Sequence, residues 1–278
     1  MSDLGARQVG DRLWLAPTAT KIPPEARAAV VITGSHGGAY VGYLAARAGV
    51  AALVVHDAGV GLDQAGIGSL PWCERLGIAA VAVDHRSARI GDAADMLARG
   101  TLSHVNASAA ALGCTPGMTC ADAAEHLRGA RPSASTVPSY AEARHVLGHN
   151  RHGLAIVCID SVSLVAPEDA GQVVLSGSHG GAVAGQRGQP IKVAAAAAFF
   201  NDAGVGADDA GISRLAVLDE LAIAGATVAA TSARIGDGRS TLEDGLVSHV
   251  NDHARALGIV PGMRARDAVE RVGPSSPC

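Results

Sequence analysis

The chain contains most of its sequence motifs twice, in the same order. The block GSHGGA stands at 34–39 and again at 177–182, each time after an apolar run. Four further pairs of blocks follow in the same order: DAGVG at 57–61 and 202–206, SARIGD at 87–92 and 232–237, SHVN at 103–106 and 248–251, and PGM at 116–118 and 261–263. The copies are much farther apart than the repeats of a solenoid protein. The sequence therefore indicates a tandem duplication of a whole unit, with unit 1 at 12–128, a linker at 129–154 and unit 2 at 155–272.

Each unit alternates short apolar runs with helical patterns. In unit 2, for example, Ile212, Leu215 and Leu218 recur at helical spacing. Strands that alternate with helices predict a mainly parallel sheet with right-handed crossovers. We therefore expect an α/β fold of two homologous units, each a mainly parallel sheet with flanking helices, related by a pseudo-two-fold axis. We also expect a long helix through each SHVN block and one short helix in the linker.

The composition excludes several classes of function. Apolar residues make up 48% of the chain and charged residues 17%, and the net charge of −4 gives no basic surface for nucleic acid. The apolar run AAAAAFF at 194–200 is too short to cross a bilayer. The first residues lack the pattern of a signal peptide. Five cysteines without a CxxC pair suit a reducing compartment. We expect a cytoplasmic protein that binds a small molecule, with neither nucleic acid nor membrane as a partner; a homo-oligomer stays open.

Three of the repeated blocks, GSHGG, DAGVG and SARIGD, follow predicted strands. In a parallel sheet the carboxyl ends of the strands share one edge, and open α/β sheets bind their ligands there. The sequence therefore predicts a site at this edge, built from three loops in each unit.

The GSHGG block is expected to supply catalytic groups and backbone amides. Glycines permit positive φ and close approach to the backbone, and amides at a helix start can hold an anion or an oxyanion. The alternative is a tight turn whose serine caps a helix. The candidates are Ser35, His36, Ser178 and His179 for catalysis, and Gly37, Gly38, Gly180 and Gly181 for substrate binding.

The DAGVG block places Asp57 and Asp202 directly after a strand. We count both as catalytic candidates, because a carboxylate there can orient a histidine, bind a metal or act as a base. The alternative is a turn in which the aspartate accepts hydrogen bonds from its own backbone. The preceding residue is His56 in one copy and Asn201 in the other, which suggests that the copies are not equivalent. Two later aspartates, Asp63 and Asp208, are expected to cap the following helix.

The SARIGD block supplies the remaining candidates, which we assign to substrate binding: Ser87, Arg89, Ser232 and Arg234. A fixed guanidinium group suits a substrate carboxylate, whereas the alternative is an ion pair with a neighbouring aspartate. For the last residue of the block, Asp92 or Asp237, we expect helix capping.

The motifs do not point to a cofactor. The chain has no Walker-type loop, and GSHGG does not match GxGxxG. His249 and His253 have the spacing of a metal pair, but unit 1 has Ser108 in place of the second histidine. We predict no cofactor, and the sequence leaves a divalent metal open.

Three functions fit these residues. We favour a cofactor-independent enzyme, a hydrolase acting on an amide- or carboxylate-bearing small molecule bound at the glycine-rich loops. In that reading a histidine of GSHGG transfers the proton and an aspartate of DAGVG orients it. An isomerase or lyase with symmetry-related acid and base residues is the second reading. A non-catalytic protein for anion binding or assembly is the third.

Overall fold

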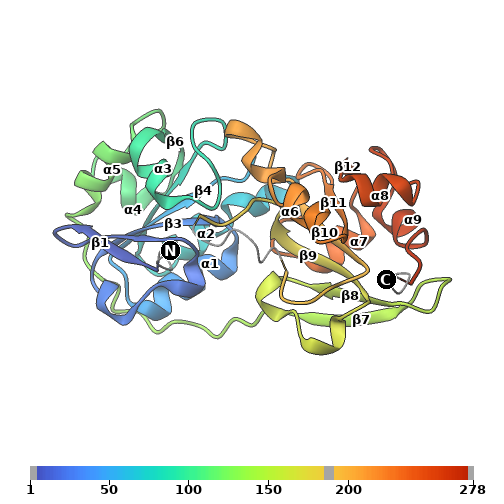
Figure 1. Ribbon diagram of the computed structural model, residues 1–278. Coiled ribbons are helices and arrows are strands. Elements are labelled where there is room, and N and C mark those ends of the chain that lie inside the picture. The colour runs from blue at the N-terminus through green and yellow to red at the C-terminus, as the bar shows by residue number, and fades with distance from the viewer. Residues whose placement is uncertain (1–4, 185–190, 275–278) are drawn as a thin grey trace.

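The computed structural model describes residues 5–184 and 191–274, which form two halves of the same architecture. Each half contains one six-stranded sheet, with the strand orders β1-β2-β3-β4-β5-β6 and β12-β11-β10-β9-β8-β7. Figure 1 shows the first half in blue to green and the second in yellow to red, side by side. The chain is therefore two tandem α/β units, as the repeated motifs predict.

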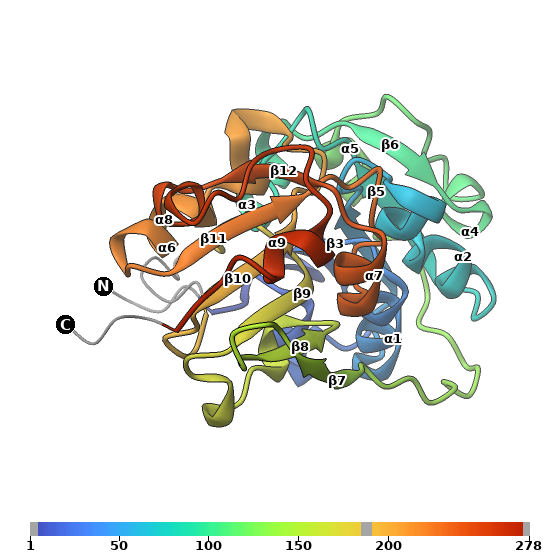
Figure 2. The same ribbon diagram turned by 90° about the vertical axis from the view of Figure 1, so that its right-hand side faces the viewer.

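Four central strands of each sheet are parallel, and both edge strands are antiparallel to their neighbours. Figure 2 shows the second sheet fanning from β7 to β12. The first sheet consists of β1 (Arg7–Gly10), β2 (Leu13–Ala16), β3 (Val30–His36), β4 (Ala52–His56), β5 (Ala79–Val83) and β6 (Leu102–Val105). The second consists of β7 (Arg144–His149), β8 (Ala155–Ile159), β9 (Val173–His179), β10 (Ala197–Asn201), β11 (Ala224–Val228) and β12 (Val247–Val250).

Helices cover both faces of each sheet, so that the central strands are buried on both sides and are mostly apolar. In the first half α1 (Ala39–Ala48) and α2 (Ser69–Glu74) cover one face, and α3 (Ala93–Arg99), α4 (Ala107–Ala110) and α5 (Cys120–Leu127) cover the other. The second half contains α6 (Arg214–Glu220), α7 (Gly238–Glu243), α8 (Asp252–Ala256) and α9 (Ala265–Val269). The 3-10 helices are η1 (Ala19–Lys21), η2 (Pro24–Ala26), η3 (Leu62–Ile67), η4 (Val162–Leu164), η5 (Pro167–Asp169) and η6 (Ala207–Ile212). Within the described residues, none of these helices has the length and apolar character that a membrane span requires.

The predicted helix through SHVN is wrong, because these residues form the edge strands β6 and β12. The asparagine of this block makes equivalent hydrogen bonds in both halves. Asn106 accepts hydrogen bonds from the backbone amides of Ala80 and Ala109, and so ties β5 to the start of α4. In the second half Asn251 accepts from Gly225 and Ala254 in the same way.

The predicted linker contains a strand instead of a helix. Residues 144–149 form β7, which pairs with β8 and completes the second sheet. The second sheet therefore begins inside the segment 129–154, just as the first begins at β1, before residue 12.

The halves meet through their two DAGVG blocks. Four consecutive residues in each block have positive φ: Ala58, Gly59, Val60 and Gly61, and Ala203, Gly204, Val205 and Gly206. This left-handed turn brings the two backbones so close that a Cβ on Gly59 would lie 2.9 Å from the Cα of Gly204. On each side a backbone hydrogen bond crosses to the other half, from Leu62 to Ala230 and from Ala207 to His85. The contacts are reciprocal, as a pseudo-two-fold axis requires.

Asp63 and Asp208 take part in this interface and do not cap helices. Both have positive φ within a 3-10 helix, which is not a capping conformation. The carboxylate of Asp63 lies 3.0 Å from the guanidinium of Arg234, and that of Asp208 lies 2.6 Å from Arg99. Each aspartate therefore forms an ion pair with the opposite half. The predicted caps Asp92 and Asp237 do accept backbone hydrogen bonds at the starts of α3 and α7.

Candidate active site between the two halves

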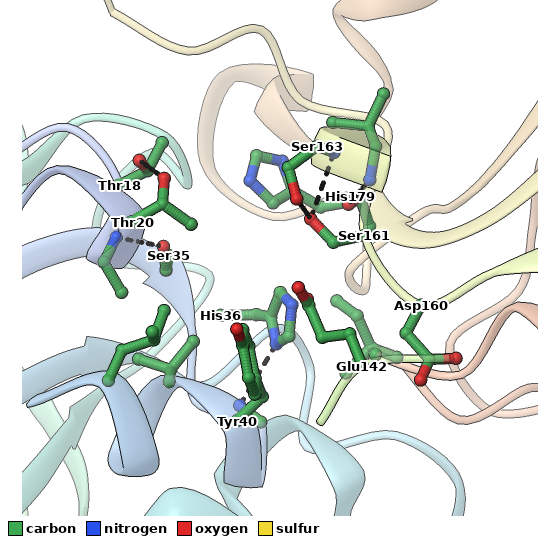
Figure 3. Close-up of a pocket in the computed structure, with 18 of the residues that line it drawn as sticks. Thr18, Thr20, Ser35, His36, Tyr40, Glu142, Asp160, Ser161, Ser163 and His179 are labelled. Atoms are coloured by element: carbon green, nitrogen blue, oxygen red, sulfur yellow. Dashed lines mark hydrogen bonds between the residues drawn. The ribbon is translucent and has the colours of Figure 1, made fainter. Parts of the chain in front are cut away.

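A cavity of about 480 Å³ lies between the halves, where the loops after β2, β3, β8 and β9 face each other. Ser35 and His36 line it from the first half, and Ser178 and His179 line it from the second. Figure 3 shows these loops around a shared space, with the ring of His36 near its centre. The structure thus brings the paired serines and histidines of the two GSHGG blocks to one cavity.

The two serines fix the loops beside them. The Oγ atom of Ser35 accepts a hydrogen bond from the backbone amide of Ala19, and that of Ser178 accepts one from Val162, both at 2.9 Å. No hydrogen bond joins either serine to a histidine among the described residues, so the geometry does not form a serine–histidine nucleophile pair. Each hydroxyl group keeps its own proton and can donate it to a ligand.

The two histidines are held as neutral donors. The Nδ1 atom of His36 accepts from the amide of Gly38 at 3.1 Å, and that of His179 accepts from Gly181 at 3.2 Å. A neutral imidazole with Nδ1 as acceptor carries its proton on Nε2. Burial, reinforced by nearby charge, lowers the pKa of His36 to about 4 and the pKa of His179 well below its ordinary value. The rings lie edge to face with their centroids 6.4 Å apart.

The glycines of GSHGG are required by crowding. None of Gly37, Gly38, Gly180 and Gly181 has positive φ, contrary to the conformational role expected for them. A Cβ on Gly37 would lie 2.4 Å from the carbonyl oxygen of Gly66. A Cβ on Gly38 or Gly181 would lie under 3 Å from the imidazole of the histidine two residues earlier. Helix α1 starts after the first copy, whereas 182–184 after the second copy are not helical.

The two aspartates of DAGVG form turns and do not line the cavity. Asp57 accepts from the amides of Gly59 and His85 and from the ring of His85. Asp202 accepts from the amides of Gly204 and Ala230. The expected pairing of these carboxylates with the histidines of GSHGG is absent from the described contacts, because the backbone turn and the SARIGD loop already engage both aspartates.

His56 and Asn201 perform the same structural task, so this difference does not make the halves unequal. His56 accepts from the amide of Ala58 and lies 3.0 Å through Nε2 from the carbonyl oxygen of Ala88. Asn201 accepts from Ala203, and its Nδ2 donates to Ala233 at 3.0 Å. An imidazole and an amide here bridge the same two points of the backbone.

The two arginines of SARIGD form ion pairs. Arg89 lies 2.8 Å from Asp95, and Arg234 pairs with Asp63 across the interface while lining the cavity. Arg89 does not line the cavity. The hydroxyl groups of Ser87 and Ser232 each donate a hydrogen bond to the backbone carbonyl oxygen three residues earlier. Each also accepts one from a backbone amide just before the next edge strand, Thr101 or Leu246, and so holds the loop in place.

Several cavity residues were not among the sequence candidates. They are Lys21, Tyr40, Glu142, Asp160, Lys192 and Arg214. The scarcity of lysine was a usable signal, because the sequence contains only Lys21 and Lys192 and both line this cavity. The others carry no such signal, because no identical residue stands at a matching position of the other copy.

Glu142 is the most perturbed carboxyl group of the cavity. Burial and the nearby charge of Asp160 raise its pKa to about 7, although the neighbouring hydroxyl groups of Ser161 and Tyr40 act in the opposite direction. Figure 3 shows its side chain pointing into the space beside His36. At neutral pH this group exchanges readily between its acid and base forms.

Arg214 contributes a buried cation at the start of α6, where the first half has Ser69. Its guanidinium lies 4.7 Å from the centroid of the Phe200 ring and donates to the carbonyl oxygen of Gly181 at 3.0 Å. Burial lowers its pKa to about 10, so the group stays charged at neutral pH.

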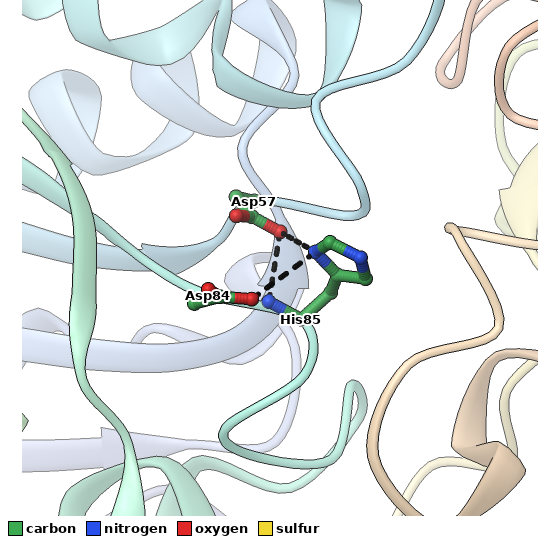
Figure 4. Close-up of side chains that lie close together, drawn as sticks. All are labelled: Asp57, Asp84 and His85. Carbon is green, nitrogen blue, oxygen red and sulfur yellow. Dashed lines mark hydrogen bonds and ion pairs between the residues drawn. The ribbon is translucent and has the colours of Figure 1, made fainter.

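One cluster outside the cavity has the composition of a metal site. Asp57, Asp84 and His85 place ligand atoms within 4.8 Å of one another, as Figure 4 shows. Several of their atoms have partners within the protein, because His85 contacts both carboxylates through Nδ1 and Asp84 forms a 2.8 Å ion pair with Arg86. The three side chains form a hydrogen-bonded and ion-paired cluster at the interface. His249 and His253, which have metal-pair spacing, belong to no such group among the described residues.

Comparisons with known proteins identify no relative. No protein-family model, no curated protein and no solved structure matches the chain.

Proposed function

We propose that the cavity is the active site of a cofactor-independent hydrolase, acting on a small molecule that carries a carboxylate and an amide or ester. One combination supports this proposal: Glu142, which titrates near neutral pH, shares the cavity with the neutral imidazoles of His36 and His179. A carboxylate with such a pKa is suited to take a proton from water. Neutral imidazole N–H groups are suited to stabilise a developing oxyanion.

In the proposed reaction, Glu142 takes a proton from a water molecule as the water oxygen bonds to the carbonyl carbon. The charge that develops on the carbonyl oxygen is stabilised by the Nε2–H groups of His36 and His179. Glu142 then transfers the proton to the leaving nitrogen or oxygen as its bond to carbon breaks. The histidines act as donors here, in place of the proton-transfer role expected from the sequence, because their Nδ1 atoms already accept from backbone amides.

The test is the variant Glu142→Gln, assayed on a panel of short amides and esters that also carry a carboxylate. Loss of a general base typically lowers turnover by about 10²- to 10⁴-fold. Glu220→Gln is the matched control, because Glu220 is exposed and lies outside the cavity. Equal turnover by the two variants would contradict the assignment, and a wild-type protein that binds panel members without turnover would favour the non-catalytic reading.

An isomerase or lyase is the second candidate, favoured by the position of Tyr40 beside Glu142 in the cavity wall. Tyr40 and Glu142 thus offer two titratable groups to a ligand in the cavity, as acid and base catalysis at carbon requires. The two reactions separate in isotopic water. An isomerase transfers solvent deuterium to carbon, whereas a hydrolase transfers the oxygen of water to its acid product.

A further inference from the structure

The cavity presents the same set of donors from both halves. After β2 the hydroxyl groups of Thr18 and Thr20 lie 2.7 Å apart, and after β8 those of Ser161 and Ser163 lie 2.8 Å apart. Figure 3 shows the two hydroxyl pairs on different sides of the space. All four residues line the cavity, and each pair adjoins the amide that donates to the serine of its own GSHGG block.

His36 and His179 form a further pair of equivalent donors, one from each half. Both imidazoles use Nδ1 in the same backbone contact, so both leave an Nε2–H donor for a ligand. A ligand that uses all of these donors needs acceptor oxygens in two places, related approximately by the same axis.

Positive charge also comes from both halves. Lys21 lines the cavity from the first half, and Lys192 and Arg214 line it from the second. Of the carboxylates in the wall, Asp160 accepts from two backbone amides and Asp237 pairs with Arg234. Charged acceptors gain more from such donors than neutral ones do.

We infer that the ligand is a short dicarboxylate skeleton, with one oxygen-bearing end held by the Thr18–Thr20 side and the other by the Ser161–Ser163 side. This inference rests on the proposed function for its reactive group: the substrates are monoamides or monoesters of such dicarboxylates. Glu142 lies in the chain just before β7 of the second half, so we assign the amide or ester end to that side and the free carboxylate to the first side.

Calorimetric titration of the full chain with succinate, glutarate and adipate, against butyrate and hexanoate, tests the inference directly. We expect one dicarboxylate to bind at least about 10-fold more tightly than the monocarboxylate of the same chain length, because the second end gains charged hydrogen bonds. Thr18→Val and Ser161→Ala should each weaken that dicarboxylate about 5- to 10-fold. Thr231→Val is the control, because Thr231 is exposed and lies outside the cavity.

The outcomes distinguish the two proposals. Equal affinity for monocarboxylates and dicarboxylates, or dicarboxylate binding that neither cavity variant weakens, overturns the inference but leaves hydrolysis by Glu142 standing. Tight dicarboxylate binding without hydrolysis of any monoamide or monoester supports the ligand class and contradicts the proposed reaction.

Discussion

The substitution Gly59→Ala tests whether the backbone contact between the halves sets their separation. Gly59 has φ of +72°, and an added Cβ would lie 2.9 Å from Cα and 3.3 Å from the nitrogen of Gly204. The left-handed conformation alone costs a non-glycine residue about 1 kcal/mol. Overlap with a backbone that cannot rotate away adds about 1–3 kcal/mol. We therefore expect the free energy of unfolding to fall by about 2–4 kcal/mol in total.

Gly77 provides the matched control. Its φ is +70°, and no neighbouring heavy atom lies within 4 Å of an added Cβ. Gly77→Ala should therefore lose only the conformational part, about 1 kcal/mol. Urea unfolding measures both, provided that the slope of free energy against denaturant is the same for the two variants. Equal losses would refute the reasoning, since the whole difference is assigned to Gly204.

Three further predictions follow from single contacts. His56→Asn should lower the free energy of unfolding, measured in urea, by less than about 1 kcal/mol, because Asn201 already bridges the same backbone groups in the other half. A decrease above about 2 kcal/mol would contradict that equivalence. Asn106→Ala should lower the free energy of unfolding by about 3 kcal/mol or more, because two backbone amides and a carbonyl oxygen lose their buried partner. A decrease below about 1 kcal/mol would contradict this role of Asn106. Turnover should rise with pH through about 7, because Glu142 acts in its deprotonated form and its pKa is raised to about 7; a rate that falls over this range excludes Glu142 as the base.

The duplication made the architecture predictable. The two copies of the unit can be aligned, and the alignment separates the residues that both copies share from those that differ. The SHVN prediction failed for a physical reason. Leu102 and Val105 fit helical spacing, but the backbone of this block pairs with β5, a contact distant in sequence. Local periodicity cannot report that pairing. The missed strand β7 is a different case, because it pairs with β8, the next strand along the chain.

The candidate site was predictable only where its residues occur in both copies of the repeat. Comparison of the copies selects what the halves share, and His36 and His179 do line one cavity. Glu142 lies outside the two repeated units and Arg214 matches Ser69 in the other copy, so the repeated motifs point to neither residue. For the aspartates of DAGVG the sequence left a turn and a site open, and the structure shows the turn.

Because both halves belong to one covalent chain, residues at matching positions on the two sides of the pseudo-two-fold axis can differ, which is impossible in an assembly of identical subunits. In a homodimer, any side chain introduced beside the axis appears twice, so an acid would always face a second copy of itself. Here the position of Arg214 is occupied by Ser69 on the opposite side, although the surrounding turns remain matched. Fusion therefore lets each side of a two-fold cavity acquire its own side chains, one substitution at a time.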